Sequence, residues 1–339
     1  MSALDPAIAE MDRRWKESGI PGLYEGSGPE MRERARNIRA LLYPKPKLPS
    51  GRIDRITIPG PAGAIDARVV WPLAADAAGA APDLAPQSTG TVVYFHGGGW
   101  ILGDLDSHEA HAIRIANATG AVVVNVGYRL APEDPFPAGV DDAWAATRWV
   151  AANLAQFGGV ARPLAVGGDS ACGNFAAVMA VLCRDAVIPL AAQLLIYPAT
   201  DLARMGESVV EGLYLGADRA AKARDPRASP IFTPTLAGVA PAIIGVGPFD
   251  FLYRDNLAYA AALRKSGVAV LWREYPTLNH GFFSYTAISQ DSAAAADQLC
   301  GDLRALLSGE LGVDGSAGAA AVVAAAATVA AAAAAASTA

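Results

Sequence analysis

The chain has 339 residues, of which 53% are hydrophobic and 18% are charged, and its formal net charge at pH 7 is −6. This length allows one large core or two smaller ones, and the acidic balance argues against nucleic acid or an anionic membrane surface as a partner. Cys172, Cys183 and Cys300 have no disulfide-framework spacing and indicate free thiols. No basic region followed by an apolar run opens the chain, so we expect a cytoplasmic protein that does not act at a membrane.

The first 50 residues predict a helical arm laid over the core. Their apolar residues recur at helical spacing, and the prolines of Tyr43-Pro44-Lys45-Pro46 cannot continue a helix. From Arg52 the period changes to two, which predicts an antiparallel pair of strands over 53–58 and 65–71. Residues 73–90 are rich in Ala, Pro, Gly and Asp and predict a surface loop.

Buried strands then alternate with helices in a catalytic domain expected to span residues 51–310. The predicted strands cover 91–96, 121–126, 164–168, 193–197, 242–246 and 268–274, and the predicted helices cover about 107–118, 138–154, 171–184, 254–266 and 289–307. This alternation predicts an α/β fold with a mostly parallel eight-stranded sheet and helices on both faces. The interval 202–235 breaks the rhythm and predicts a cap above the strand ends. Residues 311–339 are mostly alanine and predict a low-complexity tail, either a frayed helix or disordered.

One serine lies on a predicted strand-to-helix turn. In Gly168-Asp169-Ser170-Ala171 the turn lifts the Ser170 hydroxyl clear of the sheet and aims the N–H groups of the helix N-terminus at an oxyanion. The usual G-x-S-x-G pattern has glycine where this chain has Cys172, with Gly173 following. We expect Cys172 to crowd the contact between strand and helix and to point into the packing, so it is not a candidate nucleophile. Taken alone, a chance turn of small residues is an equal alternative.

A glycine run follows the strand 91–96. Three glycines in His96-Gly97-Gly98-Gly99-Trp100 allow the backbone to expose N–H groups toward a ligand. We therefore predict an oxyanion hole formed by the N–H groups of Gly97, Gly98 and Ala171. The alternative is a plain glycine turn, which the second signal at Ser170 disfavours.

One of the four histidines is placed to act as the base. His280 follows the last predicted strand, in a loop that would reach the carboxyl ends of the strands, whereas His96 leads the glycine run and is expected to be structural. Asp250, in the loop after the preceding strand, is the predicted acid. Its rival Asp255 lies one helical turn further on and is expected to face solvent. The chain order Ser170, Asp250, His280 is that of the α/β-hydrolase fold.

The remaining two histidines could suggest a metal site. His108 and His111 have no third ligand at a sensible spacing, so no metal is predicted. Instead we expect Asp106 or Ser107 to cap a helix, with Glu109 closing a capping box on Asp106.

These stretches together resemble the hormone-sensitive-lipase-like family of α/β-hydrolases, the bacterial family IV esterases, over about residues 60–308. The resemblance rests on His96-Gly97-Gly98-Gly99-Trp100, Tyr128-Arg129-Leu130-Ala131-Pro132-Glu133, Gly168-Asp169-Ser170-Ala171, Asp250 with Leu252, and His280-Gly281-Phe282. It implies the α/β-hydrolase fold with a small helical cap, no cofactor, short-chain acyl esters as small-molecule substrates, and a homodimer.

The resemblance also implies roles for individual residues. The nucleophile, acid and base correspond to Ser170, Asp250 and His280, and the oxyanion donors to Gly97, Gly98 and Ala171. His96, Glu133, Asp169 and Asn174 would support this geometry. Trp100, Phe251 and Phe282 are expected to line the substrate pocket.

Two further departures from the family pattern concern this pocket. The usual Asp-Pro-Leu after the acid is Asp250-Phe251-Leu252 here, which leaves an aromatic ring near the site. The segment 213–219 runs quickly into Asp225-Pro226-Arg227-Ala228-Ser229-Pro230, so the cap is shorter than usual and a more open pocket is expected.

The expected activity is hydrolysis of carboxylic esters through a Ser-His-Asp triad and an acyl-enzyme. An amide or carbamate hydrolase with the same triad is the alternative, because the sequence does not determine the leaving group. A binding-only protein like the plant gibberellin receptors, which lack the catalytic histidine, is disfavoured because all three triad residues are present. A lipase working at an oil–water interface is disfavoured because no long apolar lid is apparent.

Overall fold

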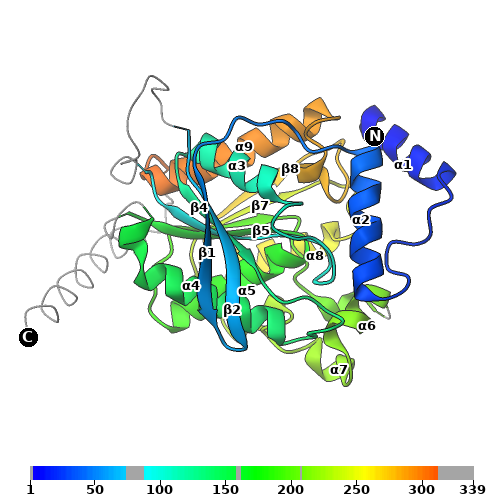
Figure 1. The fold of residues 1–339 in the computed structure, drawn as a ribbon. Helices are drawn as coiled ribbons and strands as arrows, with labels where there is room; N and C mark the ends of the chain where they lie inside the picture. The colour runs from blue at the N-terminus through cyan, green and yellow to red at the C-terminus, as the bar shows by residue number, and fades with distance from the viewer. Residues whose placement is uncertain (1–2, 74–87, 158–161, 207, 312–339) are drawn as a thin grey trace, which may run out of the picture.

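The computed structural model describes residues 3–73, 88–157, 162–206 and 208–311, which fold around one eight-stranded sheet (Figure 1). The strand order is β1-β2-β4-β3-β5-β6-β7-β8; β2 pairs antiparallel with both β1 and β4, and every other neighbouring pair is parallel. The predicted mostly parallel eight-stranded sheet is thus confirmed. The strands are β1 (Ile53–Gly60), β2 (Gly63–Val70), β3 (Thr91–Phe95), β4 (Val122–Gly127), β5 (Leu164–Asp169), β6 (Ala192–Ile196), β7 (Ala242–Val246) and β8 (Val270–Glu274).

Helices cover both faces of the sheet, as predicted. Successive strand residues point to opposite faces, so Val93 and Phe95 of β3 join one buried cluster while Val92 and Tyr94 join the other. The first cluster packs under α4 (Ala138–Ala152), α5 (Ala171–Asp185) and α8 (Tyr253–Lys265), and the second under α3 (Glu109–Thr119) and α9 (Gln290–Ser308). Most of the predicted loop 73–90 and all but the first residue of the predicted tail 311–339 lie outside the described residues.

The N-terminal segment forms two helices, α1 (Pro6–Glu17) and α2 (Gly28–Leu42), and α2 stands across one end of the sheet (Figure 1). Asp5 begins α1, because its carboxylate accepts the backbone N–H groups of Ala7 and Ile8. The Asp5 N–H also donates to the carbonyl of Thr277 at 2.8 Å, and the hydroxyl of Ser289 donates to the Asp5 carboxylate at 2.9 Å. The start of this segment is therefore held by the last part of the catalytic fold.

The cap interval 202–235 contains only short helices. These are α6 (Val209–Leu215), α7 (Arg219–Lys222) and two single 3₁₀ turns, Leu202–Arg204 and Pro230–Phe232. Asn174 of α5 ties the interval to the core, since its amide donates to the carbonyls of Ala199 and Ala228, both at 2.7 Å. Among the described residues, no helix combines the length and apolar character that crossing a bilayer requires.

Candidate active site

The structure brings the three predicted triad residues together at the carboxyl ends of the strands. Ser170 follows β5, and its Oγ lies 2.8 Å from Nε2 of His280. The other ring nitrogen, Nδ1, lies 2.8 Å from the Asp250 carboxylate, whose side chain is buried. The second carboxylate oxygen of Asp250 accepts the N–H of Leu252 at 2.7 Å, which fixes its orientation. A proton on Nδ1 leaves Nε2 free to accept the serine proton.

The rival carboxylate is positioned differently from the prediction. Asp255 in α8 was expected to face solvent, yet it is 7% exposed, and its carboxylate pairs with Arg204 at 3.4 Å. Burial raises the pKa of Asp255 to about 6 despite this neighbouring cation. The burial arises because the first turn of α8 packs against the segment after β6, where the Thr200 hydroxyl donates to the Asp255 carbonyl at 3.3 Å. Among the described residues, Asp250 contacts the imidazole of His280 and Asp255 does not.

The turn at Ser170 depends on close backbone approaches at two glycines. Ser170 has φ 56° and ψ −123°, a sparsely populated conformation for a residue with a side chain. A Cβ on Gly168 would lie 2.1 Å from the carbonyl oxygen of Cys172, and one on Gly173 would lie 2.8 Å from Cβ of Pro198. The close contact at Gly168 involves the backbone carbonyl of Cys172, so Gly168 has no room for a side chain, and crowding by the Cys172 side chain itself stays a prediction.

The Cys172 side chain is buried and points away from the cleft, as predicted. Its Sγ donates to the Tyr128 hydroxyl at 2.9 Å, and burial raises the pKa of the thiol well above its usual value. A protonated, inaccessible thiol cannot act as a nucleophile. Cys183 and Cys300 are buried and unpaired as well.

We predict that Gly168→Ala lowers the free energy of unfolding by roughly 3 kcal/mol, because a methyl group cannot fit 2.1 Å from a backbone carbonyl. Urea unfolding followed by circular dichroism measures this change. Gly301→Ala in α9 is the matched control, since nothing lies within 4 Å of its added Cβ and alanine favours a helix by about 0.5–1 kcal/mol. Equal stability of Gly168→Ala and wild type would contradict the close approach.

The three glycines all line the cleft, but they differ in whether their N–H groups are already hydrogen-bonded. The Gly97 N–H donates to Oδ1 of Asp169 at 2.9 Å, so the prediction of Gly97 as an oxyanion donor is corrected. By contrast, the N–H groups of Gly98 and Gly99 make no hydrogen bond to a described residue, and both glycines line the cleft with Ser170. Gly98 has φ 128°, which favours glycine, and a Cβ there would lie 2.4 Å from the Leu102 carbonyl oxygen.

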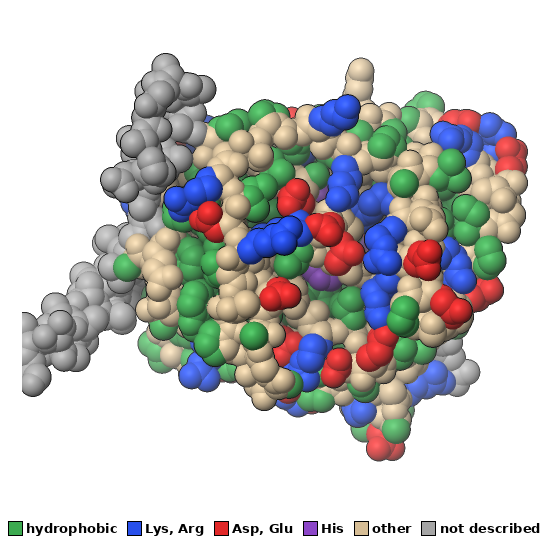
Figure 2. All heavy atoms as spheres, viewed as in Figure 1, with side chains coloured by type: hydrophobic (Ala, Val, Ile, Leu, Met, Phe, Trp, Pro, Cys, Tyr) green, Lys and Arg blue, Asp and Glu red, His purple; other side chains and the backbone are tan. Residues whose placement is uncertain are grey.

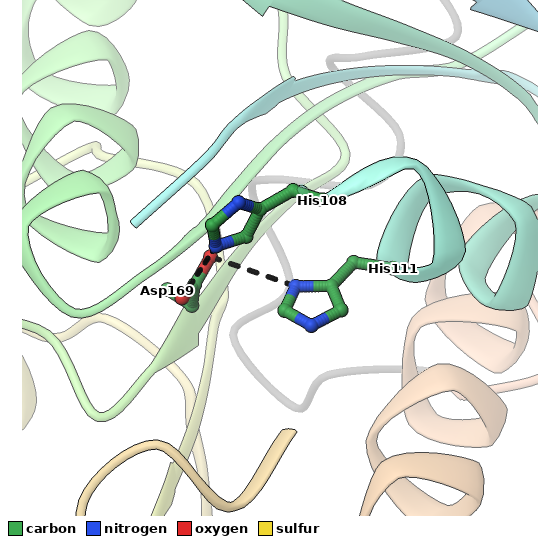
Figure 3. A group of neighbouring side chains, drawn as sticks. All are labelled: His108, His111 and Asp169. Atoms are coloured by element: carbon green, nitrogen blue, oxygen red, sulfur yellow. Dashed lines mark ion pairs between the residues drawn. The ribbon is translucent and has the colours of Figure 1, made fainter. Parts of the chain in front are cut away.

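Asp169 supports this run from behind, together with two histidines (Figure 3). Nε2 of His108 and Nδ1 of His111 lie 3.7 and 3.9 Å from its carboxylate, which also accepts the Tyr94 hydroxyl at 2.7 Å. Burial lowers the pKa of His108 to about 3 and lowers that of His111, so both rings are neutral near pH 7. Burial alone would raise the pKa of Asp169, but its polar contacts with the two histidines hold it well below the usual value.

The prediction that His108 and His111 have no third potential metal ligand is wrong. Asp169 is a third potential ligand, contributed by a distant strand, and the ligand atoms of His108, His111 and Asp169 all lie within 4.8 Å of one another. Much of the cluster is already hydrogen-bonded within the protein: Oδ1 of Asp169 accepts the Gly97 N–H and the Tyr94 hydroxyl, and Nδ1 of His108, the ring nitrogen that does not face Asp169, lies 2.8 Å from the Ser107 hydroxyl. We therefore interpret the cluster as a polar support for the glycine run.

The predicted capping box is wrong. Helix α3 begins at Glu109 with His108 as its N-cap residue, and no side chain caps it. The carboxylates of Asp106 and Glu109 instead pair with the nearly buried guanidinium of Arg68 in β2. A nearly buried cation such as Arg68 needs charged partners, so it takes both carboxylates that could otherwise have capped the helix.

The other predicted supporting residues make well-defined contacts. His96 is buried, with its ring stacked on Tyr128 at 4.5 Å and its Nδ1 3.1 Å from the Gly97 carbonyl, which agrees with a structural role. Glu133 is ion-paired with Arg32 of α2 and so joins the N-terminal segment to the catalytic fold.

A cleft of about 180 Å³ opens above Ser170 and His280. Neither Trp100 nor Phe282 lines it, contrary to prediction: Trp100 is 1% exposed and stacks on Tyr214 at 4.2 Å, while Phe282 is buried against Tyr197. Phe251 does not line this cleft either: it is 71% exposed beside the site, and its ring centroid lies 4.5 Å from that of His280. A larger cavity of about 370 Å³, between α5 and residues 226–235, contains none of the triad.

Sequence reasoning missed the part of the cleft wall that the N-terminal helices form. The wall residues contributed by this segment are Leu23, Tyr24, Arg32, Ala35, Arg36, Arg39 and Tyr43. The three arginines recur at spacings of four and three, so they share one face of α2, and this spacing was the available signal.

Comparison with known proteins agrees with this architecture. A family model described as alpha/beta hydrolase fold matches residues 92–284. Carboxylesterase NlhH of Mycobacterium tuberculosis is 38% identical over 278 residues, which are 76% of this chain and 84% of that protein. Carboxylic ester hydrolase LipN of the same organism is 36% identical over 333 residues, covering 91% of this chain and 84% of LipN. The solved hyperthermophilic esterase from the archaeon Pyrobaculum calidifontis has a TM-score of 0.76 at 33% identity and covers 90% of this chain and 99% of that chain. The chain therefore belongs to the hormone-sensitive-lipase-like family of α/β-hydrolases.

Proposed function

We propose that this carboxylesterase hydrolyses short-chain acyl esters with Ser170 as the nucleophile. Carboxylic ester hydrolysis is the activity of the family members named above, which match most of the chain. The single observation that carries the assignment of residues is the continuous line of contacts from Asp250 through His280 to Ser170, each 2.8 Å long. This line ends at the cleft, where a substrate carbonyl can reach the serine oxygen.

In the proposed mechanism, His280 takes the Ser170 proton as Oγ attacks the ester carbonyl. Asp250 orients the imidazole and stabilises its charged form. The N–H groups of Gly98, Gly99 and Ala171 bind the oxyanion, because the first two are unpaired among the described residues and the third is at the first position of α5. His280 then protonates the leaving alcohol, and water repeats the sequence on the acyl-enzyme.

We predict that activity on p-nitrophenyl esters peaks at two to six acyl carbons and falls by about 100-fold for long chains, because a cleft of about 180 Å³ encloses only a small acyl group. The measurement is kcat/KM across a series from acetate to palmitate. A maximum at long chains would contradict the proposed substrate size. Cleavage of the matching p-nitroanilides but of none of the esters would instead indicate an amide hydrolase.

A further inference from the structure

A row of arginines lines the cleft opposite the triad. Arg32, Arg36 and Arg39 lie on one face of α2, and all three belong to the wall of the cleft that contains Ser170 and His280. Figure 2, drawn in the same view as Figure 1, shows Lys and Arg side chains gathered in a column along α2. Although the net charge of the chain is −6, positively charged side chains are thus concentrated beside this cleft.

Only one of these arginines lacks a carboxylate partner among the described residues. Arg32 pairs with Glu133, and Arg36 lies 3.6 Å from the Asp104 carboxylate. Arg39 donates from one Nη to the Ser107 carbonyl at 2.5 Å, and its guanidinium carbon lies 5.6 Å from the centre of the Tyr43 ring. A guanidinium has five N–H donors, so most of those of Arg39 remain available to a ligand.

Three tyrosines with uncommitted hydroxyl groups line the cleft together with this guanidinium. Tyr24, Tyr43 and Tyr285 line the same cleft, and in the described part of the chain their hydroxyls make no hydrogen bond. The Tyr43 and Tyr285 rings meet edge to face at 5.1 Å, which places both beside Arg39. Burial raises the pKa of Tyr24 to about 12 and raises that of Tyr285 further, so both hydroxyls stay protonated and can donate at neutral pH.

The two acidic residues in the cleft wall, Asp104 and Asp169, do not pair with Arg39 and so do not neutralise its charge. Asp104 faces Arg36 and accepts the Ser107 N–H at 2.6 Å. Asp169 is 4% exposed, and its carboxylate already accepts the Gly97 N–H and the Tyr94 hydroxyl. Asp169 is therefore nearly inaccessible and already hydrogen-bonded, whereas Arg39 is only half-buried in the wall of the cleft.

We propose that Arg39 and the adjacent tyrosine hydroxyls bind a carboxylate carried by the substrate, so that the preferred esters are anionic. A guanidinium with phenol donors matches the geometry and charge of a carboxylate, and such charge-assisted hydrogen bonds are stronger than neutral ones. This inference rests on the proposed esterase function of the same cleft. It makes Arg39 a specificity-determining residue, and the reaction remains ester hydrolysis by water.

Matched pairs of esters test the proposal. One pair places the charge on the acyl side, p-nitrophenyl hydrogen adipate against p-nitrophenyl hexanoate, and the other places it on the alcohol side, 4-acetoxybenzoate against 4-acetoxybenzamide. For each pair the ratio of kcat/KM, anionic over neutral, is measured in wild type and in Arg39→Gln. We expect wild type to favour the anion in one pair and Arg39→Gln to lower that ratio about tenfold, mainly through KM.

Two further variants separate charge from structure. Arg39→Lys retains the cation and should keep part of the preference. Arg34→Gln, on the same helix, is the matched control, because Arg34 binds the carbonyls of Gly22 and Glu25 at 2.8 Å and does not line the cleft. Its ratios should equal those of wild type.

The outcomes distinguish this inference from the proposed function. Cleavage of the neutral esters with no preference for an anion, or with an unchanged ratio in Arg39→Gln, overturns the inference and leaves the esterase in place. Failure to cleave any ester counts against the proposed function, and calorimetric titration with adipate then decides on the carboxylate site. Weaker adipate binding in Arg39→Gln than in wild type would support the site, and equal binding would overturn it.

Discussion

Replacing Ser170 by alanine is expected to lower kcat/KM for p-nitrophenyl acetate by at least about 10⁴-fold. The variant loses the one hydroxyl that the described residues bring within hydrogen-bond distance of Nε2 of His280, so no acyl-enzyme is expected to form. Oxyanion binding would leave a small residual rate. Initial rates with purified protein measure the loss, and an unchanged unfolding midpoint shows that it is chemical.

Cys172→Ser is the matched control for this experiment. The substitution lies two residues from Ser170, keeps the shape of the side chain and preserves a donor to the Tyr128 hydroxyl. Its activity should stay within about tenfold of wild type, since the buried thiol takes no part in the reaction. Activity lost in Cys172→Ser but kept in Ser170→Ala would reverse the assignment of the nucleophile.

The second large effect is expected for Asp250→Asn, with kcat lower by about 10³- to 10⁴-fold. An amide oxygen stabilises the imidazolium less than a carboxylate does, and the amide group can instead donate to Nδ1 and hold the ring in the wrong tautomer. Steady-state kinetics should show KM nearly unchanged, because Asp250 is buried behind the histidine and does not reach the substrate.

Asp255→Asn tests whether the effect is specific to the carboxylate that contacts the imidazole. Asp255 is also buried and lies five residues further along the chain, but it pairs with Arg204 and has no contact with His280. We expect its kcat to remain within about threefold of wild type. A loss as large as that of Asp250→Asn would mean that both carboxylates act on the imidazole.

The triad could be predicted from the sequence because its members obey local rules. Ser170 lies on a turn between a predictable strand and helix, and Asp250 and His280 each follow a strand whose apolar run is plain. Parallel strands end at the same edge of the sheet, so the three loops meet once the strands are identified. This topology brings the three side chains to one edge of the sheet, and the structure adds the contacts of 2.8 Å between them.

Features that depend on contacts between distant segments could not be predicted. The Gly97 N–H appeared available until Asp169, 72 residues away, was seen to accept it. Trp100 follows the glycine run in sequence, yet a cap helix stacks Tyr214 on its ring and buries it. The position of Arg39 in the cleft could not be predicted either, because it depends on how α2 packs against the catalytic fold.

The hydrogen bonds of Asp5 to Thr277 and Ser289 have a consequence for the order in which the fold is completed. A ribosome releases α1 well before Thr277 and Ser289, which hold its N-cap residue Asp5. Until about residue 290 has emerged, Asp5 lacks its partners Thr277 and Ser289. When they do emerge, their contacts with Asp5 close a loop of more than 270 residues, which carries an entropic cost. Helix α1 is therefore synthesised first but secured on the fold late, whereas α2 can dock earlier through its contacts with Glu133 and Ser107.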